Sequence, residues 1–361
     1  MPSSECCAAN KPLKKRLIRP QRKSTPCSSK ASSILPRPSP RRRAGQPLAI
    51  RRRIRAPLAG DSLMRRTRSI SQLVSALPFV LPGLALFAAF VIGPMLYSFR
   101  ISFYDWKIIR PERSEWLGLA NYARALGDPI FLRAVLNTAA YTLITVPGQM
   151  LFGLIVALLL DQSIRGRAVF RVVYYLPVIT SWVIVSLLFE YMFVGQAGLV
   201  NYLLRDVFHL MKENIRWLAD PILVFVPIDL LGIWKGVGWT AVIFLAGLQS
   251  IPDHLHEAAA VDGAGPVARF WYITLPLLRP TLVFLIVVLT IGGLNAYISN
   301  LLITDGGNPL DLTHFVLTLM YEATFTKLDF GYGSAISYLL TACVFVISVI
   351  QIRLLRRQVE L

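Results

Sequence analysis

The sequence of 361 residues predicts an all-α membrane protein with six transmembrane helices, and three observations lead to this prediction. First, 55% of the residues are apolar and only 16% are charged, whereas soluble proteins carry about 25% charged residues. Second, five stretches long enough to cross the hydrocarbon core contain no charged residue. Third, the positive charge lies almost wholly before the first of these stretches. A buried soluble helix would explain any one stretch, but it explains five in one chain poorly.

The basic segment, residues 1–63, comes first along the chain. It holds sixteen Lys and Arg against Glu5 and Asp61, which is a balance of +14 out of the total of +18. Because it is rich in Pro, Ser and Arg and has no apolar period, we expect a disordered tail. Two interpretations are open. The tail binds nucleic acid or anionic lipid, or it is a start-site artefact and translation begins at Met64, before a basic flank and an apolar span.

Residues 64–361 are expected to form the transmembrane domain. Its spans are predicted at about 74–98, 135–160, 172–193, 230–248, 280–303 and 331–352. As helices, all of them close their backbone hydrogen bonds internally, which lipid requires. The fourth span is the least clear because it contains Lys235. We expect this residue near the outer end of the helix, where its side chain can snorkel to the interface.

The distribution of Lys and Arg predicts that both chain ends are cytoplasmic. With the N-terminus inside, the internal segments 64–72, 161–171, 249–279 and 353–361 hold eleven Lys and Arg. The external segments are longer and hold ten. Since positive residues favour the cytoplasmic side, this bias places the loop 249–279 in the cytoplasm.

The loop 249–279 is polar and predicts two short helices. Ser250 begins a pattern typical of a capping box, so a helix is expected from there to about Val261. Asp262-Gly263 indicates a turn, and Pro266 suits the first turn of a second helix. Two further prolines are expected to break the path into the next span: Pro276 and Pro280.

The stretch EAAAVDGAGPVARFWYITLPLLRP, residues 257–280, resembles the EAA loop of binding-protein-dependent ABC importer permeases. Its long form is similar to that of sugar-uptake permeases, including those for maltose-type sugars and glycerol phosphate. Other segments agree with this resemblance over about 115–357, namely GLANY at 118–122, FRVVYYLP at 170–177, WKGVGWTAVIFLAGLQSIP at 234–252 and GYGSAIS at 331–337. ITDGGNP at 303–309 departs from the tighter T-x-GGP of the family, in an outer loop.

The resemblance implies a type I ABC importer permease arrangement with a cytoplasmic coupling helix that seats in a separate ATPase subunit. It assigns the coupling role to Glu257, Ala258, Ala259, Asp262 and Gly263. For an isolated Glu-Ala-Ala, a solvated surface helix would be the better interpretation, but the whole pattern favours coupling. The chain has no phosphate-binding G-x-x-x-x-G-K-[ST] loop. We therefore expect no enzyme activity and no cofactor on this chain, with ATP and Mg²⁺ used by the partner ATPase.

The stretch IGGLNAYISNLL, residues 291–302, is the most polar part of any span and is the candidate solute path. Its candidate residues are Asn295, Tyr297, Ser299 and Asn300, which offer hydrogen bonds and an aromatic face to a sugar. Helix packing is the alternative role for each of them. Weaker candidates for the path are Gln149, Glu190 and Lys235.

The resulting hypothesis is a multi-pass permease subunit of an ATP-driven importer in the bacterial inner membrane, surrounded by membrane lipid. Its expected partners are a second permease in a heterodimer, an ABC ATPase dimer, a solute-binding protein, and a sugar or sugar-like solute. No His or Cys spacing indicates a metal site. Two alternatives are open: a permease for an amino acid or peptide, and a membrane-tethered nucleic-acid or lipid binder that acts through the basic tail.

Overall fold

The structure is a computed structural model that describes residues 78–162 and 166–356. The predicted tail, residues 1–63, lies outside the described residues. Within the described part, five helices are long and apolar enough to cross a membrane: Pro78–Ile101, Pro129–Asp161, Phe225–Gln249, Arg279–Ile303 and Phe330–Leu355. The region of the third predicted span holds two apolar helices, Val172–Ile179 and Trp182–Met192, that are bent by 99° at a short break. The predicted all-α class is confirmed, with five membrane-crossing helices, or six if the bent pair forms one span.

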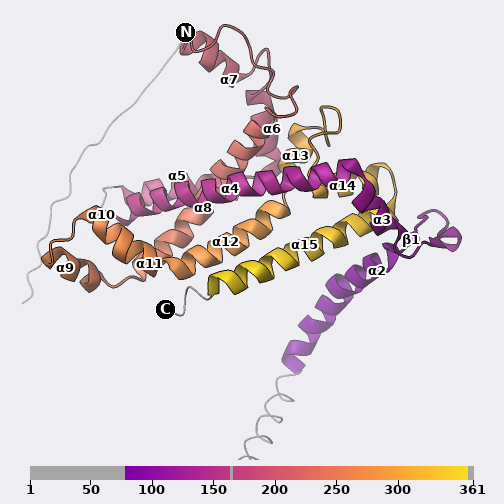
Figure 1. Cartoon of the computed structure of the whole chain (residues 1–361), viewed down its shortest axis with the longest axis horizontal. Coiled ribbons are helices and arrows are strands. Elements are labelled where there is room, and N and C mark those ends of the chain that lie inside the picture. The colour runs from indigo at the N-terminus through magenta and orange to yellow at the C-terminus, as the bar shows by residue number, and fades with distance from the viewer. Residues whose placement is uncertain (1–77, 163–165, 357–361) are drawn as a thin grey trace, which may run out of the picture. The chain divides into compact units, whose positions relative to one another are not determined.

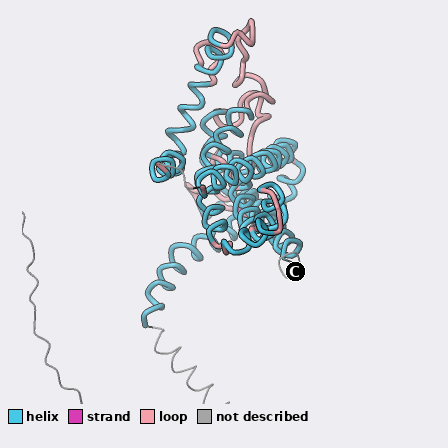
Figure 2. The backbone as a smooth tube through the Cα atoms, turned by 90° about the vertical axis from the view of Figure 1, so that its left-hand side faces the viewer, coloured by secondary structure: helices cyan, strands magenta, loops and turns pink. Residues whose placement is uncertain are grey.

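Four long helices run side by side and form the body of the bundle (Figure 1). These are α4 (Pro129–Asp161), α8 (Phe225–Gln249), α12 (Arg279–Leu294) and α15 (Phe330–Arg356). The shorter helices are α2 (Gly93–Ile101), α3 (Ala120–Gly127), α5 (Arg167–Ile179), α6 (Trp182–Met192), α7 (Leu199–Tyr202), α9 (Asp253–Val261), α10 (Pro266–Arg269), α11 (Leu275–Leu277), α13 (Ile298–Ile303) and α14 (Val316–Tyr321). Four π-helical segments extend them, Ala88–Ile92, Leu203–Val207, Phe270–Thr274 and Glu322–Thr326, and Pro111–Arg113 forms a 3₁₀ turn. Figure 2 shows how far helix dominates the fold.

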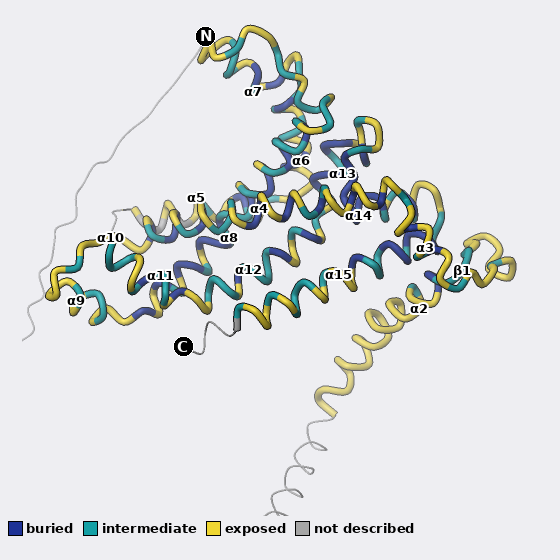
Figure 3. The backbone as a smooth tube through the Cα atoms, in the orientation of Figure 1, coloured by how far each residue is buried: buried dark blue, intermediate teal, exposed yellow. Residues whose placement is uncertain are grey.

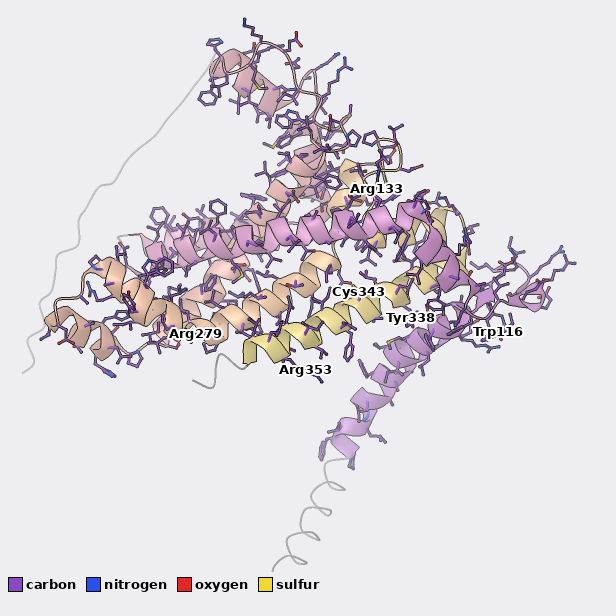
Figure 4. The ribbon with its side chains drawn as sticks, viewed as in Figure 1. Trp116, Arg133, Arg279, Tyr338, Cys343 and Arg353 are labelled. Carbon is purple, nitrogen blue, oxygen red and sulfur yellow. The ribbon has the colours of Figure 1, made fainter. Side chains whose placement is uncertain are left out.

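The two ends of the bundle differ in what they carry. One end holds α9 to α11, and the other holds the strands β1 (Tyr104–Asp105) and β2 (Glu115–Trp116) together with α14 (Figure 1). Arg279 and Arg353 lie towards the first end, and Arg133 lies towards the second (Figure 4).

The core of the bundle is the contact between α4 and α8, which pack along each other. Small residues allow the close approach. A Cβ on Gly153 would lie 2.7 Å from Cγ2 of Thr240 on α8, and one on Gly148 would lie 2.7 Å from Cδ1 of Ile233. Without a hydrophobic force between helices in lipid, such close packing is the main attraction. The largest side chains buried at this core include Phe244, Leu278 and Leu285.

The GLANY and GYGSAIS segments meet at the hairpin. The Asn121 side chain donates hydrogen bonds to the backbone oxygens of Ser102 and Tyr104, both at 3.0 Å. A Cβ on Gly331 would lie 2.1 Å from the same Tyr104 oxygen, so α15 begins directly against the strand. The pair of strands is antiparallel, with Tyr104 opposite Trp116. These motifs therefore hold the last turn of α2 and the first turn of α15 together.

The first membrane-crossing helix, Pro78–Ile101, has little cover within the chain. No residue of its most apolar window is buried, and Figure 3 shows its α2 portion exposed along nearly all its length. Near its end, the Tyr338 hydroxyl on α15 donates to the Met95 oxygen, and Ser98 and Ser334 hydroxyls lie 3.3 Å apart. The helix is thus anchored at one end, where the Phe99 ring also packs against Tyr338, while most of its apolar surface is exposed.

Candidate functional site

A cavity of about 440 Å³ opens between α4, α8, the end of α12 and the break between α5 and α6. Its size lies within the range of small-molecule sites, about 300–1,000 Å³. Four aromatic side chains line it, Tyr141, Trp182, Trp239 and Tyr297, alongside the polar side chains of Gln149, Lys235, Asn295 and Ser299. No Asp or Glu is among its lining residues.

Lys235 is the only cationic side chain in the lining of this cavity. It lies inside α8 and is 4% exposed. Its ammonium donates hydrogen bonds to the backbone oxygens of Pro177 at 2.8 Å and Thr180 at 2.6 Å. The expectation that Lys235 snorkels at an outer helix end is wrong, because carbonyl groups of α5 replace water around the charge in the interior.

The Gln149 side chain on α4 occupies space left by a glycine on α8. A Cβ on Gly236 would lie 2.2 Å from Cδ and Oε1 of Gln149. Within the described part of the chain, no hydrogen bond to the Gln149 amide is found. Its donors and acceptor are therefore available to a solute in the cavity.

Three of the four candidate path residues line the cavity, namely Asn295, Tyr297 and Ser299. Asn295 donates from Nδ2 to the Ile291 oxygen at 2.8 Å, and this bond leaves the side-chain oxygen of Asn295 available to another donor. Two of the weaker candidates, Gln149 and Lys235, also belong to the lining, and Glu190 does not.

Asn300 lies outside the lining and is fully buried. It donates to the Thr313 oxygen at 2.8 Å, and its own oxygen accepts from the Thr318 hydroxyl at 2.8 Å and from the Phe315 amide at 3.3 Å. With both amide groups used, Asn300 holds the loop 304–315 against α14. The structure thus separates Asn300 from the other three candidates.

His314 belongs to the same loop and is 2% exposed. Its Nε2 lies 3.3 Å from Oε2 of Glu322, whose Oε1 lies 3.0 Å from Nζ of Lys327. Burial lowers the pKa of His314, and the carboxylates of Glu322 and Asp311 act in the opposite direction. Among residues 78–162 and 166–356, no cluster of three His, Cys, Asp or Glu could hold a metal ion.

The candidate coupling loop, residues 249–279, starts differently from its prediction. The Ser250 hydroxyl donates to the Gly247 oxygen at 2.6 Å at the end of α8, and α9 starts without a side-chain cap. Ser250 therefore ends the preceding helix and does not begin a capping box. The predicted first helix itself is present as α9, from Asp253 to Val261.

The end of α9 is closed by Gly263, which has φ of +83°. The Gly263 amide bonds the Ala260 oxygen at 3.1 Å, and the Ala264 amide bonds the Ala259 oxygen at 2.9 Å. This pair of bonds is the Schellman motif, in which glycine adopts the left-handed conformation at low cost. The turn predicted at Asp262-Gly263 is thus present.

Pro276 and Pro280 were expected to break the helical path into the next span, and they do not. The chain is helical from Pro266 to Leu277, and Leu278 separates it from α12. The π-helical segment Phe270–Thr274 lies before Pro276, and Pro280 falls in the first turn of α12, where an amide has no helical partner. Both prolines therefore fit within a nearly continuous helical path.

The outer surface of the coupling loop is exposed (Figure 3). Glu257, Ala258, Asp262 and Gly263 are exposed, and Ala259 is half-buried. Apolar side chains lie open beside them, with Val261 at 88% and Tyr272 at 82% exposure. On the inner side, Leu255 packs against the α4–α8 core. The loop is thus attached on one side and offers small, acidic and apolar groups on the other.

Trp182 and Trp239 line the cavity, although the sequence did not predict them there. Their positions depend on the 99° bend before α6 and on the close packing of α5 against α8, and neither feature leaves a periodic pattern in the sequence. A signal for Lys235 did exist, because a charged residue inside an apolar span marks a functional site by default.

The chain matches known proteins over most of its length. Residues 149–360 match the family described as binding-protein-dependent transport system inner membrane component. The sulfoquinovosyl glycerol transport system permease of Agrobacterium fabrum is 34% identical, over 76% of this chain and 88% of that protein. The lactose permease protein of Rhizobium radiobacter is 33% identical, and the trehalose/maltose permease protein of Thermococcus litoralis is 32% identical, each over 76% of this chain and 91% of the relative.

A solved structure shares the fold. The crystal structure of a bacterial ABC transporter that imports the acidic polysaccharide alginate aligns with a TM-score of 0.69 at 22% identity, covering 81% of this chain and 99% of that chain. A second structure shows this transporter with an alginate pentasaccharide-bound periplasmic protein, at a TM-score of 0.70. From its sequence match and its helices, this chain belongs to the family of binding-protein-dependent transport system inner membrane components, as a membrane permease of an ABC importer.

Proposed function

We propose that the chain translocates a sugar or sugar-like solute that an extracytoplasmic binding protein delivers, driven by ATP hydrolysis on a separate subunit. The cavity between α4, α8 and α12 carries this proposal. Trp182, Trp239 and Tyr297 offer flat aromatic faces, and Gln149 and Asn295 offer amide groups. Sugars present both apolar C–H faces and hydroxyl groups, so this lining suits them. The substrates in the names of the relatives support the same class.

The coupling loop is the proposed docking site of the ATPase. The carboxylate of Glu257 makes no ion pair within the described part of the chain. Val261, one turn further along α9, exposes apolar surface, and Tyr272 exposes more in the same loop. An exposed apolar group beside an acid is typical of a protein interface. Ala258 and Ala259 let the partner approach the α9 backbone, and the Gly263 turn fixes the loop that the ATPase moves. ATP and Mg²⁺ belong to that subunit.

The second permease is the proposed cover of the first membrane-crossing helix. Pro78–Ile101 leaves its apolar sides exposed, and lipid or a neighbouring subunit must cover them. The position of Arg279 and Arg353 at the end of the bundle that holds α9 supports a cytoplasmic location for that end and for the C-terminus (Figure 4).

A pull-down tests the docking surface. The chain is tagged at Leu361 and purified in mild detergent as wild type, as Glu257→Lys, and as the control Glu112→Lys, which reverses an exposed acid beside the hairpin. We expect wild type and control to retain an ATPase and a second permease, and Glu257→Lys to lose the ATPase alone. Equal ATPase recovery with Glu257→Lys, together with undiminished uptake, would refute the docking role.

Uptake of radiolabelled maltose, trehalose and lactose tests the cargo class. We expect one of these sugars to enter cells that contain the complete transporter, and Asn295→Ala to raise its KM for uptake because a hydrogen-bond partner in the cavity is lost. Uptake of an amino acid or peptide, and of none of the three sugars, would replace the sugar proposal with the alternative cargo.

A further inference from the structure

The break between α5 and α6 is held by one side chain that also lines the cavity. α5 packs against α8, and α6 turns away from α5 at 99° (Figure 1). Thr180 and Ser181 at the break have extended backbone conformations. The last carbonyl groups of α5 therefore have no partner in the helix, and such groups are costly in an apolar surrounding.

Lys235 supplies donors to both of these oxygens. Its ammonium donates to the Pro177 oxygen at 2.8 Å and to the Thr180 oxygen at 2.6 Å. The Thr180 hydroxyl, 3.5 Å from the ammonium, donates to the Pro177 oxygen as well, at 2.6 Å. The positive charge also suits the negative end of the α5 dipole. No acidic side chain forms an ion pair with Lys235 among the described residues. The main partners of Lys235 are therefore the carbonyl groups at the C-terminal end of α5.

Trp182 connects the same ammonium to α6. It is the first residue of α6, and its ring centroid lies 4.9 Å from Nζ of Lys235, within cation–π distance. Trp182 and Lys235 both line the cavity, and so does Val178 of α5. A change in the angle between α5 and α6 would therefore move a wall of the cavity.

We propose that Lys235 is a positioning residue for transport: it fixes the angle between α5 and α6 and thereby the place of Trp182 in the cavity wall. This inference rests on the proposed function of the cavity. The ammonium already has two carbonyl partners and an aromatic ring, so its role is to hold the wall, while Gln149 and Asn295 contact the solute. An apolar side chain at position 235 leaves the Thr180 carbonyl without a partner and the Pro177 carbonyl with the Thr180 hydroxyl alone, and this loosens the break.

Distances between spin labels test the hinge without any solute. Labels are placed on α5 and α6 at Val173 and Tyr191, both exposed, in the full chain in lipid nanodiscs with its four cysteines replaced by serine. We expect one narrow distance distribution in the wild type, and a shifted and broadened one in Lys235→Met. Lys235→Arg keeps the charge and donors and should restore a narrow distribution. Gln149→Ala, which changes the cavity without touching the break, should keep the wild-type distribution.

Lys235→Gln is the second variant, because an amide retains two donors without the charge. We expect a distribution of intermediate width, and this variant decides the matter if Lys235→Met does not fold. A wild-type distribution in both neutral variants would overturn the proposal.

Uptake kinetics separate positioning from solute binding. With whichever of maltose, trehalose and lactose is taken up, we expect Lys235→Met to lower the maximal rate with little change in KM, and Lys235→Arg to recover the rate. Gln149→Ala should instead raise KM. A raised KM in Lys235→Met at an unchanged maximal rate would make Lys235 a solute ligand and overturn the proposal. If none of the three sugars enters, the proposed cargo fails, and the distance distributions still decide the hinge.

Discussion

The cavity wall and the coupling loop use small residues for opposite purposes. In the wall, Gly236 on α8 makes room for Gln149 of α4, and next to the wall a Cβ on Gly238 would lie 2.2 Å from the Tyr174 oxygen of α5. In the loop, Ala258 and Gly263 lie on an exposed surface, and a Cβ on Gly263 would meet nothing within 4 Å. The same residue type thus serves internal packing in one region and leaves room for an external partner in the other.

This difference predicts where mutations act. A substitution near the wall, or in the network of hydrogen bonds that Asn300 makes with Thr313, Phe315 and Thr318 (the Asn300 network), should lower the stability of the isolated chain, because its contacts are internal. A substitution in the loop should leave stability nearly unchanged and reduce the association with the ATPase. Four measurements test this difference between the two regions.

Asn300→Ala should give the largest loss of stability. It leaves buried partners at Thr313, Phe315 and Thr318 without their hydrogen bonds, and each such group costs about 1–3 kcal/mol. Denaturant unfolding in detergent measures the change. Asn295→Ala is the matched control in the cavity and should unfold close to wild type. If both variants unfold alike, the structural role of the Asn300 network does not differ from that of Asn295 in the cavity.

Gly238→Ala should lower the free energy of unfolding by about 1–3 kcal/mol, the usual cost of overpacking. The new methyl group would collide with the Tyr174 backbone and with Cγ2 of Val178. Thermal unfolding compares it with Gly292→Ala, whose Cβ would meet nothing within 4 Å. We expect Gly292→Ala to be neutral or slightly stabilising, since alanine favours helix. A neutral Gly238→Ala would contradict the close contact of α5 and α8.

Gly263→Ala should raise the free energy of the Schellman turn by about 1–2 kcal/mol, because a residue with a Cβ is disfavoured in the left-handed conformation that Gly263 adopts. Because the strain is confined to the loop, we expect a weaker hold on the ATPase and an almost unchanged unfolding transition. The control is Gly265→Ala, where φ is −69° and nothing lies within 4 Å of the added carbon. A global loss of stability in Gly263→Ala would show that the loop is part of the core.

The outer loop 304–315 should loosen in acid. Burial lowers the pKa of His314 below its ordinary 6.5, so the folded loop resists a proton that the unfolded loop accepts. The stabilisation is complete above about pH 6.5 and is lost as pH falls through the folded pKa. Hydrogen exchange of residues 304–315 measures it. His314→Gln should remove the pH dependence, and His209→Gln, at an exposed site, should keep it. Equal pH dependence in all three proteins would exclude His314 as the cause.

The features that were predicted best from the sequence are those that depend only on neighbouring residues. Long uncharged runs identify membrane-crossing helices, and Asp262-Gly263 identifies the turn, because both depend on neighbouring residues. The cavity depends on contacts between distant segments. Nothing near Lys235 in the sequence shows that the ends of α5 will lie beside it, and nothing near Asn300 shows that it faces the loop 304–315. Asn295 and Asn300 are both amides in one apolar stretch, and only the helix arrangement separates them.

The exposed first crossing, Pro78–Ile101, has a consequence for biogenesis. This helix emerges from the ribosome before the other described crossings, and it needs few of their contacts. It can therefore enter the bilayer as an independent unit and hold the nascent chain there while the remaining helices are made. In the proposed complex, a copy without its second permease leaves the apolar sides of this helix to lipid alone.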